Sequence, residues 1–454
     1  MKTNSKIKRC KNRSIIEERL RRIPFTKLSK DSEFCKRKPK KIKPKEFLIA
    51  FFMMVLGSGN NSYNNWAAKI GLLTKKTISK QALWKRMNVR QILFLQKVLN
   101  ETIKDKMKNR LSLETSGKLN QFKRVIIEDS TTIKLNDKLW KEYPGSSNQN
   151  KSKQAILKIQ VAYNLLRGSF LRFDLRSYRN NDLSYSGKIL ELCNKGDLII
   201  RDLGYFVMEI FKRITEQGAN FVSRMKANVL VYSKEEDEKP IDLAKMLRKR
   251  GQLDIDVFIG EKNRLPVRLI AIPIEASIAA ERKRKAIAEA DKRWILSKKN
   301  LYLLGWELFI TNVKKDNLEA KDIAAVYFIR WRIEIIFKCW KSYLKITNVP
   351  NDVNKIRIES YIYCMLIFIM LFQVSFYNYC LDKYSISNRK FKNKWISMMK
   401  LMQFITSNIN FLILRDFVYD RNFESRFEKL INYHCLYDNR GDRLNFSNKF
   451  QILS

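Results

Sequence analysis

Residues 124–131 read RVIIEDST, and this stretch decides the fold. Its apolar run predicts a strand buried on both faces, as in the parallel strands of α/β proteins, and Asp129 would emerge where that strand leaves the core. The stretch GDLIIRDLGYF at 196–206 repeats the pattern, with Asp202 after a buried run and Gly204 permitting a tight turn. Two strand-end acids of this kind can converge, although either one alone is more often a turn or cap residue.

Further β-rich runs, ILKIQVAYNLL, FLRFDLRSY and NFVSRM, lie between and after these blocks, together with a helical stretch around 184–195. They predict the first part of an α/β core over 113–226. Residues 227–305 hold the strand-like runs VLVY, LDIDVFI and PVRLIAI and a basic helix, which predicts a mainly β insertion. The strand WELFITNV then resumes the core, whose second part runs over 306–380.

A long helix is expected from about 317 to 346, and it contains YFIRWRIEIIFKCWKSYLKI from residue 327 onward. At about 100° per residue, one face carries polar groups within roughly 80° of one another, and the opposite face is apolar. The polar face holds Tyr327, Arg330, Glu334, Lys338 and Lys341. Considered alone, this face is as easily a solvated one with i,i+4 ion pairs.

Charge and cysteine usage narrow the classes of function. The chain of 454 residues has 90 Lys and Arg against 45 Asp and Glu, a net charge of +45, which favours a polyanionic partner such as nucleic acid. The seven cysteines form no CxxC pair, and with His434 as the one histidine the sequence offers no zinc-ligand spacing. Free thiols and the lack of a signal-peptide run at the N-terminus predict a cytoplasmic protein.

The two ends of the chain are basic. Residues 1–45 hold 18 Lys or Arg against 4 acids, and we expect an extended basic arm. A helical DNA-binding domain is predicted over 46–112, where SKQALWKRM at 79–87 opens on a good N-cap serine. That helix is the second helix of a helix-turn-helix or an ordinary solvated helix. Residues 381–454 form a basic C-terminal extension without recognisable chemistry.

The apolar run YIYCMLIFIMLFQVSFYNYC at 361–380 has the length of a membrane span. Gln373 and Asn378 interrupt it, and it follows a strongly charged helix. We therefore interpret it as a buried helix of a large core and expect no membrane association.

These motifs resemble the insertion-sequence transposases with a DDE triad, of the IS-four type, whose signature is Tyr, two residues, Arg, three residues, Glu, six residues, Lys. Tyr327, Arg330, Glu334 and Lys341 match that spacing, and the blocks IIEDST and GDLIIRDLGYF match the two aspartate blocks in the right order. The resemblance extends over roughly 35–375. Leu203 departs from it, since these enzymes often have a basic residue there, which puts one local DNA contact in doubt.

The resemblance implies an RNase H-like catalytic core in which Asp129, Asp202 and Glu334 are both the catalytic residues and the metal ligands. Carboxylates suit hard cations, so we expect two Mg²⁺ or Mn²⁺ ions that assist attack on a phosphodiester. The reaction would be cleavage at the terminal inverted repeats of an insertion sequence and strand transfer into target DNA.

The same face of the long helix would grip the double-stranded DNA. The resemblance implies phosphate contacts for Tyr327, Arg330 and Lys341, and Lys338 shares their face. A homodimer on DNA and association with the nucleoid are expected. Trp306 lies where family members handle a distorted DNA end, or is simply a core tryptophan. The alternative to the enzyme is a catalytically decayed, transposase-like DNA-binding protein.

Overall fold

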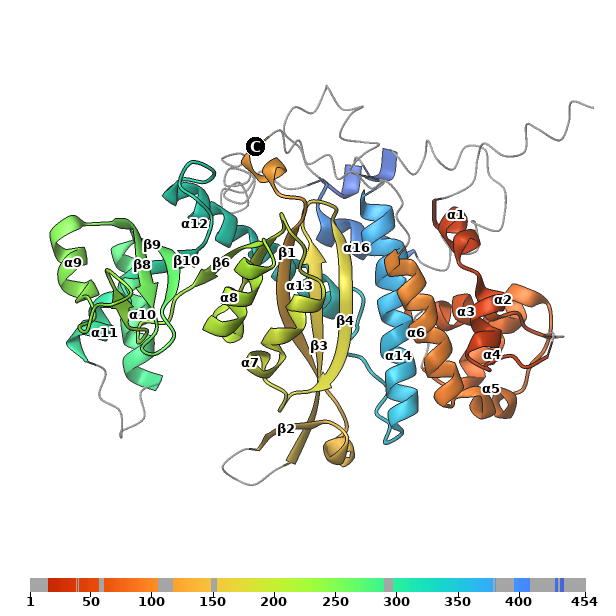
Figure 1. The fold of residues 1–454 in the computed structure, drawn as a ribbon. Helices are drawn as coiled ribbons and strands as arrows, with labels where there is room; N and C mark the ends of the chain where they lie inside the picture. The colour runs from red at the N-terminus through yellow and green to blue at the C-terminus, as the bar shows by residue number, and fades with distance from the viewer. Residues whose placement is uncertain are drawn as a thin grey trace, which may run out of the picture.

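The computed structural model describes residues 15–37, 39, 41–56, 61–104, 117–147, 153–289, 297–378, 380, 396–408, 429–431 and 433–436. Within those ranges ten strands form one mixed sheet, seen in the middle and at the left of Figure 1. The strands are β1 (Val125–Lys134), β2 (Pro144–Ser147), β3 (Lys153–Asn164), β4 (Ser169–Ser177), β5 (Leu198–Arg201), β6 (Asn220–Arg224), β7 (Val231–Tyr232), β8 (Leu253–Ile259), β9 (Leu265–Pro273) and β10 (Trp306–Thr311). Their order is β2-β3-β1-β5-β6-β10-β9-β8-β7, and β4 also pairs with β3.

The centre of the sheet is parallel. Strand β5 pairs in parallel with β1 on one side and with β6 on the other, whereas β3 runs antiparallel to both β1 and β4. Central strands of this kind are buried on both faces, as the continuous apolar runs of the sequence predicted. The large mixed sheet is consistent with an RNase H-like core.

Successive residues of the central strands point to opposite faces and build two cores. Ile127 and Ile200 belong to a core that includes α12 (Ala320–Ile329) and α13 (Trp331–Ser342). Ile126 and Ile199 point the other way, into a core shared with α8 (Met208–Glu216) and the segment around β8 and β9. The alternation follows from the two-residue repeat of a strand.

The segment predicted as an insertion continues the sheet. Strands β7, β8 and β9 form an antiparallel series, and β10 pairs antiparallel with both β9 and β6. The segment also contains the helices α9 (Leu243–Arg250), α10 (Ala276–Glu289) and α11 (Lys298–Leu303). Residues 227–305 therefore extend the core sheet edge to edge, at the left of Figure 1.

The predicted helix 317–346 begins three residues later and is broken at Arg330. The Arg330 N–H bonds the Tyr327 carbonyl at 3.1 Å, and the Ile333 N–H bonds the Arg330 carbonyl at 3.0 Å. These three-residue bonds replace the four-residue bonds of an α-helix and tighten the turn locally. The apolar face is as expected, since Ile329, Ile333 and Trp340 are buried.

The N-terminal part of the chain is helical. Its helices are α1 (Ile15–Arg22), α2 (Phe25–Asp31), α3 (Pro44–Leu56), α4 (Tyr63–Thr74), α5 (Lys80–Arg86) and α6 (Val89–Lys104). The extended arm expected over 1–45 is therefore helical from 15 to 31, because Leu20, Phe25 and Leu28 pack into the core. Residues 1–14 of that arm lie outside the described residues.

The possible membrane span lies in α14 (Lys355–Phe368) and the π-helical segment Ile369–Phe376 that follows it. Within the described residues, Lys355–Val374 is the one helix long and apolar enough to cross a bilayer, and 78% of its most apolar window is buried inside the protein. Helix α14 packs along α6 and against α3 in the right half of Figure 1. These contacts are those of a core helix.

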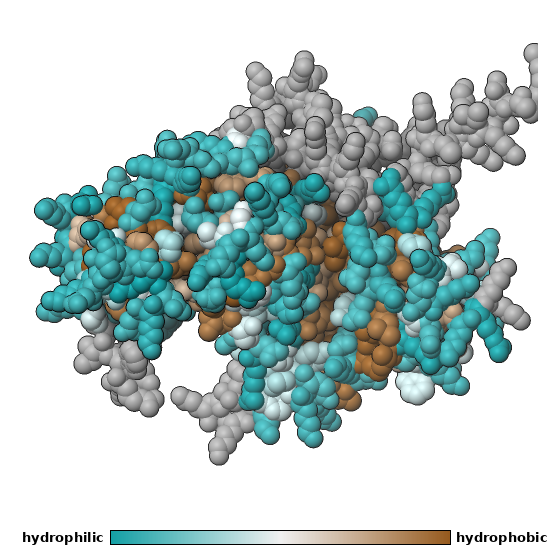
Figure 2. All heavy atoms as spheres, in the orientation of Figure 1, coloured by the Kyte–Doolittle hydropathy of each residue, from teal (hydrophilic) through white to brown (hydrophobic). Residues whose placement is uncertain are grey.

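Of the C-terminal extension, the described residues include α16 (Met398–Ser407), which buries Leu401, Met402 and Ile405. The rest of 381–454, apart from 396–397, 408, 429–431 and 433–436, lies outside the described residues. The face of the molecule in Figure 2 is hydrophilic over most of the segment at the left and the helices at the right, with apolar side chains showing between them.

Candidate active site

Asp129 and Asp202 lie at the same level of the central sheet. The parallel pairing of β1 with β5 ends at the pair Glu128 and Arg201, and each aspartate is the next residue of its strand. Asp202 leaves the sheet there, as predicted, and starts a single 3₁₀ turn. Asp129 does not end its strand, because β1 continues to Lys134 in antiparallel pairing with β3. Both aspartates therefore lie where the parallel pairing stops.

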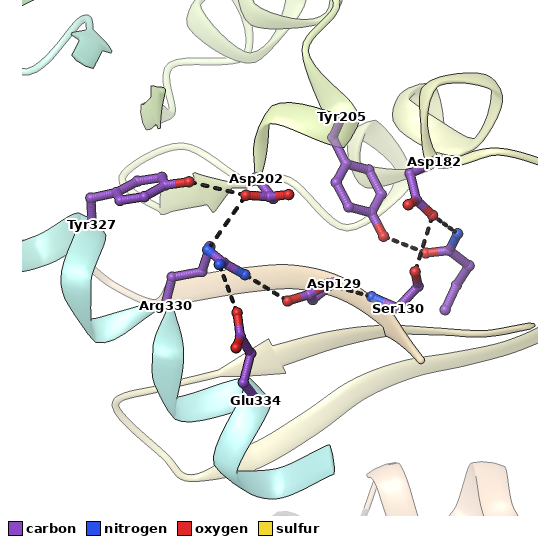
Figure 3. Close-up of polar contacts among 9 residues, drawn as sticks. Asp129, Ser130, Asp182, Asp202, Tyr205, Tyr327, Arg330 and Glu334 are labelled. Carbon is purple, nitrogen blue, oxygen red and sulfur yellow. Dashed lines mark hydrogen bonds and ion pairs between the residues drawn. The ribbon is translucent and has the colours of Figure 1, made fainter. Parts of the chain in front are cut away.

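The guanidinium of Arg330 lies between the three predicted acids (Figure 3). Its Nη1 is 2.8 Å from Asp129 Oδ2 and its Nη2 is 2.8 Å from Glu334 Oε1. Its Nε is 3.7 Å from Asp202 Oδ1, which is an ion pair without a hydrogen bond. Three acids that lie 73 and 132 residues apart along the sequence thus share one cation.

Tyr327 completes the contacts around Asp202. Its hydroxyl donates a hydrogen bond of 3.1 Å to Asp202 Oδ1, and its ring packs against Phe309 of β10 with centroids 5.2 Å apart. Burial raises the pKa of the Tyr327 hydroxyl, and the charge of Asp202 raises it further. The hydroxyl therefore stays protonated and acts as a donor to Asp202.

The charges of the site do not balance. Burial raises the pKa of Asp129 to about 7, against the lowering effects of Arg330 and of the Ser130 N–H, and Asp202 and Glu334 raise it further. For Arg330, burial lowers the pKa, but the surrounding acids, Asp129 first, outweigh it and hold the pKa above its ordinary value. One fixed positive charge facing several carboxylates leaves room for additional cationic charge.

The three acids suit a hard divalent cation, because the ligand atoms that they offer are carboxylate oxygens. In the described residues, however, no three acidic, histidine or cysteine side chains are close enough together to share one ion. The carboxylates converge on the guanidinium and not on one another. Asp129, Asp202 and Glu334 therefore have the chemistry of ligands for a divalent cation, and in the structure the Arg330 guanidinium is their counter-charge.

A buried ion pair, which the sequence reasoning missed, lies directly beneath the aspartates. Glu128 Oε2 and Arg201 Nη2 are 2.7 Å apart, and their side chains are 2% and 0% exposed. Arg201 Nη2 also donates to the Ser186 carbonyl at 2.8 Å. Burial raises the pKa of Glu128 and Arg201 opposes that shift. The available signal was a charged residue directly after the apolar run of each strand, VII in β1 and LII in β5.

Lys338 and Lys341 lie further along α13 than the acids, about one and two turns after Glu334, and both are exposed. They face solvent on the helix that carries Glu334. Trp306 begins β10, is partly buried and packs against the core beside Tyr302, with ring centroids 6.1 Å apart.

The helical N-terminal region contains a second group of exposed residues. Helix α4 ends with Lys75 in the left-handed conformation, and α5 starts a few residues later behind Ser79, whose side chain accepts a hydrogen bond from the Ala82 N–H at 3.2 Å. This serine cap is confirmed. Trp84 projects from α5 and is 61% exposed, between basic residues of the same helix. Helices α4 and α5 contact each other, and residues 75–79 connect them.

The family described as "Transposase DDE domain" matches residues 120–369 of the chain. The chain is 30% identical over 363 residues to the transposase for insertion sequence element IS231E of Bacillus thuringiensis subsp. finitimus, covering 76% of this chain and 75% of that protein. It is 31% identical over 367 residues to the transposase for insertion sequence element IS1151 of Clostridium perfringens, with 75% and 74% covered. The match includes both aspartate blocks and the helix of Glu334, so the chain belongs to the DDE-domain transposases of insertion sequences and is a DNA transposase.

Proposed function

We propose that the protein binds the terminal inverted repeats of an insertion sequence and catalyses metal-dependent cleavage of the DNA ends followed by strand transfer. The observation that carries this proposal is the convergence of Asp129, Asp202 and Glu334 on one guanidinium. Acids that gather around a cation at the edge of a buried sheet are suited to hold metal ions beside a phosphodiester.

In this proposal the three acids hold two Mg²⁺ or Mn²⁺ ions, which would polarise the scissile phosphate and favour attack by water and later by a DNA 3′-hydroxyl. Tyr327 orients Asp202 through its hydrogen bond. Arg330 leaves the carboxylates and binds a DNA phosphate, which has the charge and geometry that a guanidinium fork prefers. Its place in the IS-four signature, Tyr327, Arg330, Glu334 and Lys341, supports that role.

The DNA surface extends from the acids along α13 to Lys338 and Lys341. Both side chains are exposed and lie on the helix of Glu334, so they can reach phosphates beside the cut. Phosphate contacts carry no sequence information, so recognition of the inverted repeats is assigned to the helical region 46–112, with α5 as its reading helix. Two ends must meet before strand transfer, which implies a homodimer on DNA.

The second candidate function is a catalytically decayed transposase that only occupies DNA ends. It is favoured by the position of Arg330, whose side chain lies among the carboxylates where metal ions would bind. The two functions differ in whether the acids are used.

Cutting of a supercoiled plasmid that carries the element ends distinguishes them. With Mg²⁺ or Mn²⁺, the wild type should nick and linearise the plasmid, Glu334→Ala should lose cutting by about 10³-fold or more, and both should retain end binding in gel shifts. Glu216→Ala, an exposed acid on α8, is the matched control and should cut like the wild type. Equal cutting by Glu334→Ala would refute the catalytic role of the triad, and binding without cutting by the wild type would establish the decayed protein.

A further inference from the structure

A hydrogen-bonded chain joins strand β1 beside Asp129 to the turn of Asp202, on the side away from Arg330 (Figure 3). Its centre is Asp182, the first residue of α7 (Asp182–Tyr185). Asp182 Oδ1 accepts hydrogen bonds from Ser130 Oγ at 3.1 Å, from Lys158 Nζ at 3.1 Å and from Gln160 Nε2 at 2.7 Å. Ser130 is the residue after Asp129, and its own N–H donates to Asp129 Oδ1 at 2.7 Å.

The other end of the chain reaches the turn of Asp202. The Tyr205 hydroxyl donates to Gln160 Oε1 at 2.5 Å, and the Tyr205 N–H bonds the Asp202 carbonyl at 3.0 Å. The chemistry fixes the direction of this chain, since a carboxylate only accepts and must therefore face the amide nitrogen of Gln160. Gln160 and Tyr205 are 0% and 1% exposed, so water does not compete for these bonds.

Gly204 lies beside Asp182 in the turn that follows Asp202. The tight turn expected after Asp202 is present, and its Gly204 backbone is not in the left-handed region. A Cβ at this position would lie 3.5 Å from Asp182 Oδ2. That is an ordinary van der Waals distance, so the packing of the Asp202 turn against Asp182 does not require glycine either.

We propose that Asp182, Gln160 and Tyr205 act as a positioning clamp that fixes the spacing of Asp129 and Asp202. The clamp rests on the proposed function, because the spacing matters only if both acids bind metal. Neither Asp182 nor Tyr205 touches the metal ions or the DNA in this proposal, and both act through the neighbours of the two aspartates. Partners of metal ligands of this kind typically change metal affinity by about 10- to 100-fold when removed.

Tyr205→Phe tests the clamp, since it deletes one hydroxyl and keeps the buried ring. We expect it to raise the Mn²⁺ concentration that half-saturates binding by about 10-fold, measured by electron paramagnetic resonance on the full-length protein. The Mn²⁺ concentration for half-maximal plasmid cutting should rise by about the same factor. The rate of cutting at saturating Mn²⁺ should fall by less than this factor. The matched control is Tyr361→Phe, another tyrosine that is 1% exposed and hydrogen-bonded, with its hydroxyl 3.2 Å from the Lys345 carbonyl. It should lose similar stability and leave the Mn²⁺ dependence within about 2-fold, because it touches no neighbour of the acids.

Two further variants separate the clamp from general damage. Asp182→Ala should weaken Mn²⁺ binding like Tyr205→Phe, and the double variant should be no weaker than about the worse single variant, because one chain is broken in each case. Asp182→Asn keeps an acceptor oxygen and should restore most of the affinity. The clamp alone would be overturned if Tyr205→Phe and Tyr361→Phe bound Mn²⁺ as tightly as the wild type while Glu334→Ala still lost binding. No Mn²⁺ binding by the wild type would overturn the metal site and the clamp together.

Discussion

Two groups of charged residues occupy neighbouring positions of the same strands and differ in charge balance. Glu128 and Arg201 form a one-to-one ion pair that is closed to solvent. One residue further along each strand, Asp129 and Asp202 share Arg330 with Glu334, and their side chains are 17% and 40% exposed. The first pair has no capacity for another ion and serves the fold. The second group is short of positive charge and open to solvent, as a site for a cationic ligand must be.

The largest effect on stability is expected from unbalancing the closed pair. Glu128→Gln leaves Arg201 charged and buried, so the free energy of unfolding should fall by about 3–5 kcal/mol. Asp202→Asn also replaces a carboxylate by an amide. It should change the free energy of unfolding by less than about 1 kcal/mol when no metal is present. Urea denaturation followed by circular dichroism measures both. Recovery of stability in the double variant Glu128→Leu with Arg201→Met would show that the loss comes from the unpaired charge, and an equal loss in Glu128→Gln and Asp202→Asn would contradict the comparison.

A pH-dependent loss of stability is the next effect, and it belongs to the open group. The pKa of Asp129 is about 7 in the folded protein and about 3.9 in an unfolded chain. Between these values the folded state binds more protons than the unfolded state, so the free energy of unfolding falls as pH rises from about 4 to 7. Asp129→Asn removes this fall and should exceed the wild type by about 2–4 kcal/mol at pH 8 without metal. Denaturation at pH 5 and pH 8 checks it, and parallel pH profiles for the two proteins would contradict the raised pKa.

In the open group, the Arg330 guanidinium and the proposed metal ions would compete for the same carboxylates. Arg330→Gln leaves the carboxylates without their counter-charge, so the free energy of unfolding should fall by about 1–3 kcal/mol in EDTA. Mn²⁺ should then raise the melting temperature more in this variant than in the wild type, because no guanidinium has to be displaced. Arg268→Gln is the control, since Arg268 of β9 is also buried and is bonded to a different acid, Asp254, at 2.6 and 2.9 Å. The same Mn²⁺ response in all proteins would show that Arg330 does not occupy the metal position.

The site residues that could be predicted belong to local sequence patterns, whereas those that were missed depend on contacts between distant segments of the chain. Asp129 and Asp202 follow apolar strand runs, and the three- and four-residue spacing of Tyr327, Arg330 and Glu334 is local, so both patterns can be read from the sequence. The ion pair of Glu128 with Arg201 joins strands 73 residues apart in number, and Asp182 stands in the unremarkable stretch NNDLSY. Their partners are set by the pairing of β1, β3 and β5, which no short stretch of sequence specifies.

The helix break at Arg330 was also beyond local reasoning, since the expected continuous helix has no proline or glycine there. The break coincides with the ion pairs that draw Arg330 toward the three acids. The extension of the sheet through β10 could not be predicted locally either. The stretch WELFITNV predicts a strand but does not indicate that it pairs with both β6 and β9. Tertiary contacts determine these features, and the local sequence is compatible with them without specifying them.

The smallest effect on stability is expected at the exposed end of α13, where we propose that Lys341 contacts DNA. Lys341→Ala should change the free energy of unfolding by less than about 0.5 kcal/mol, because the side chain is exposed. It should weaken binding to a duplex of the element end in EDTA by several-fold and lower the slope of log affinity against log salt by about 1, since one phosphate contact is lost. Fluorescence anisotropy at increasing KCl measures this slope. Lys212→Ala on α8, also exposed, is the control and should keep the wild-type slope. If both lysines changed the slope equally, the basic surface would bind DNA through its overall charge, and α13 would have no special place in the DNA contact.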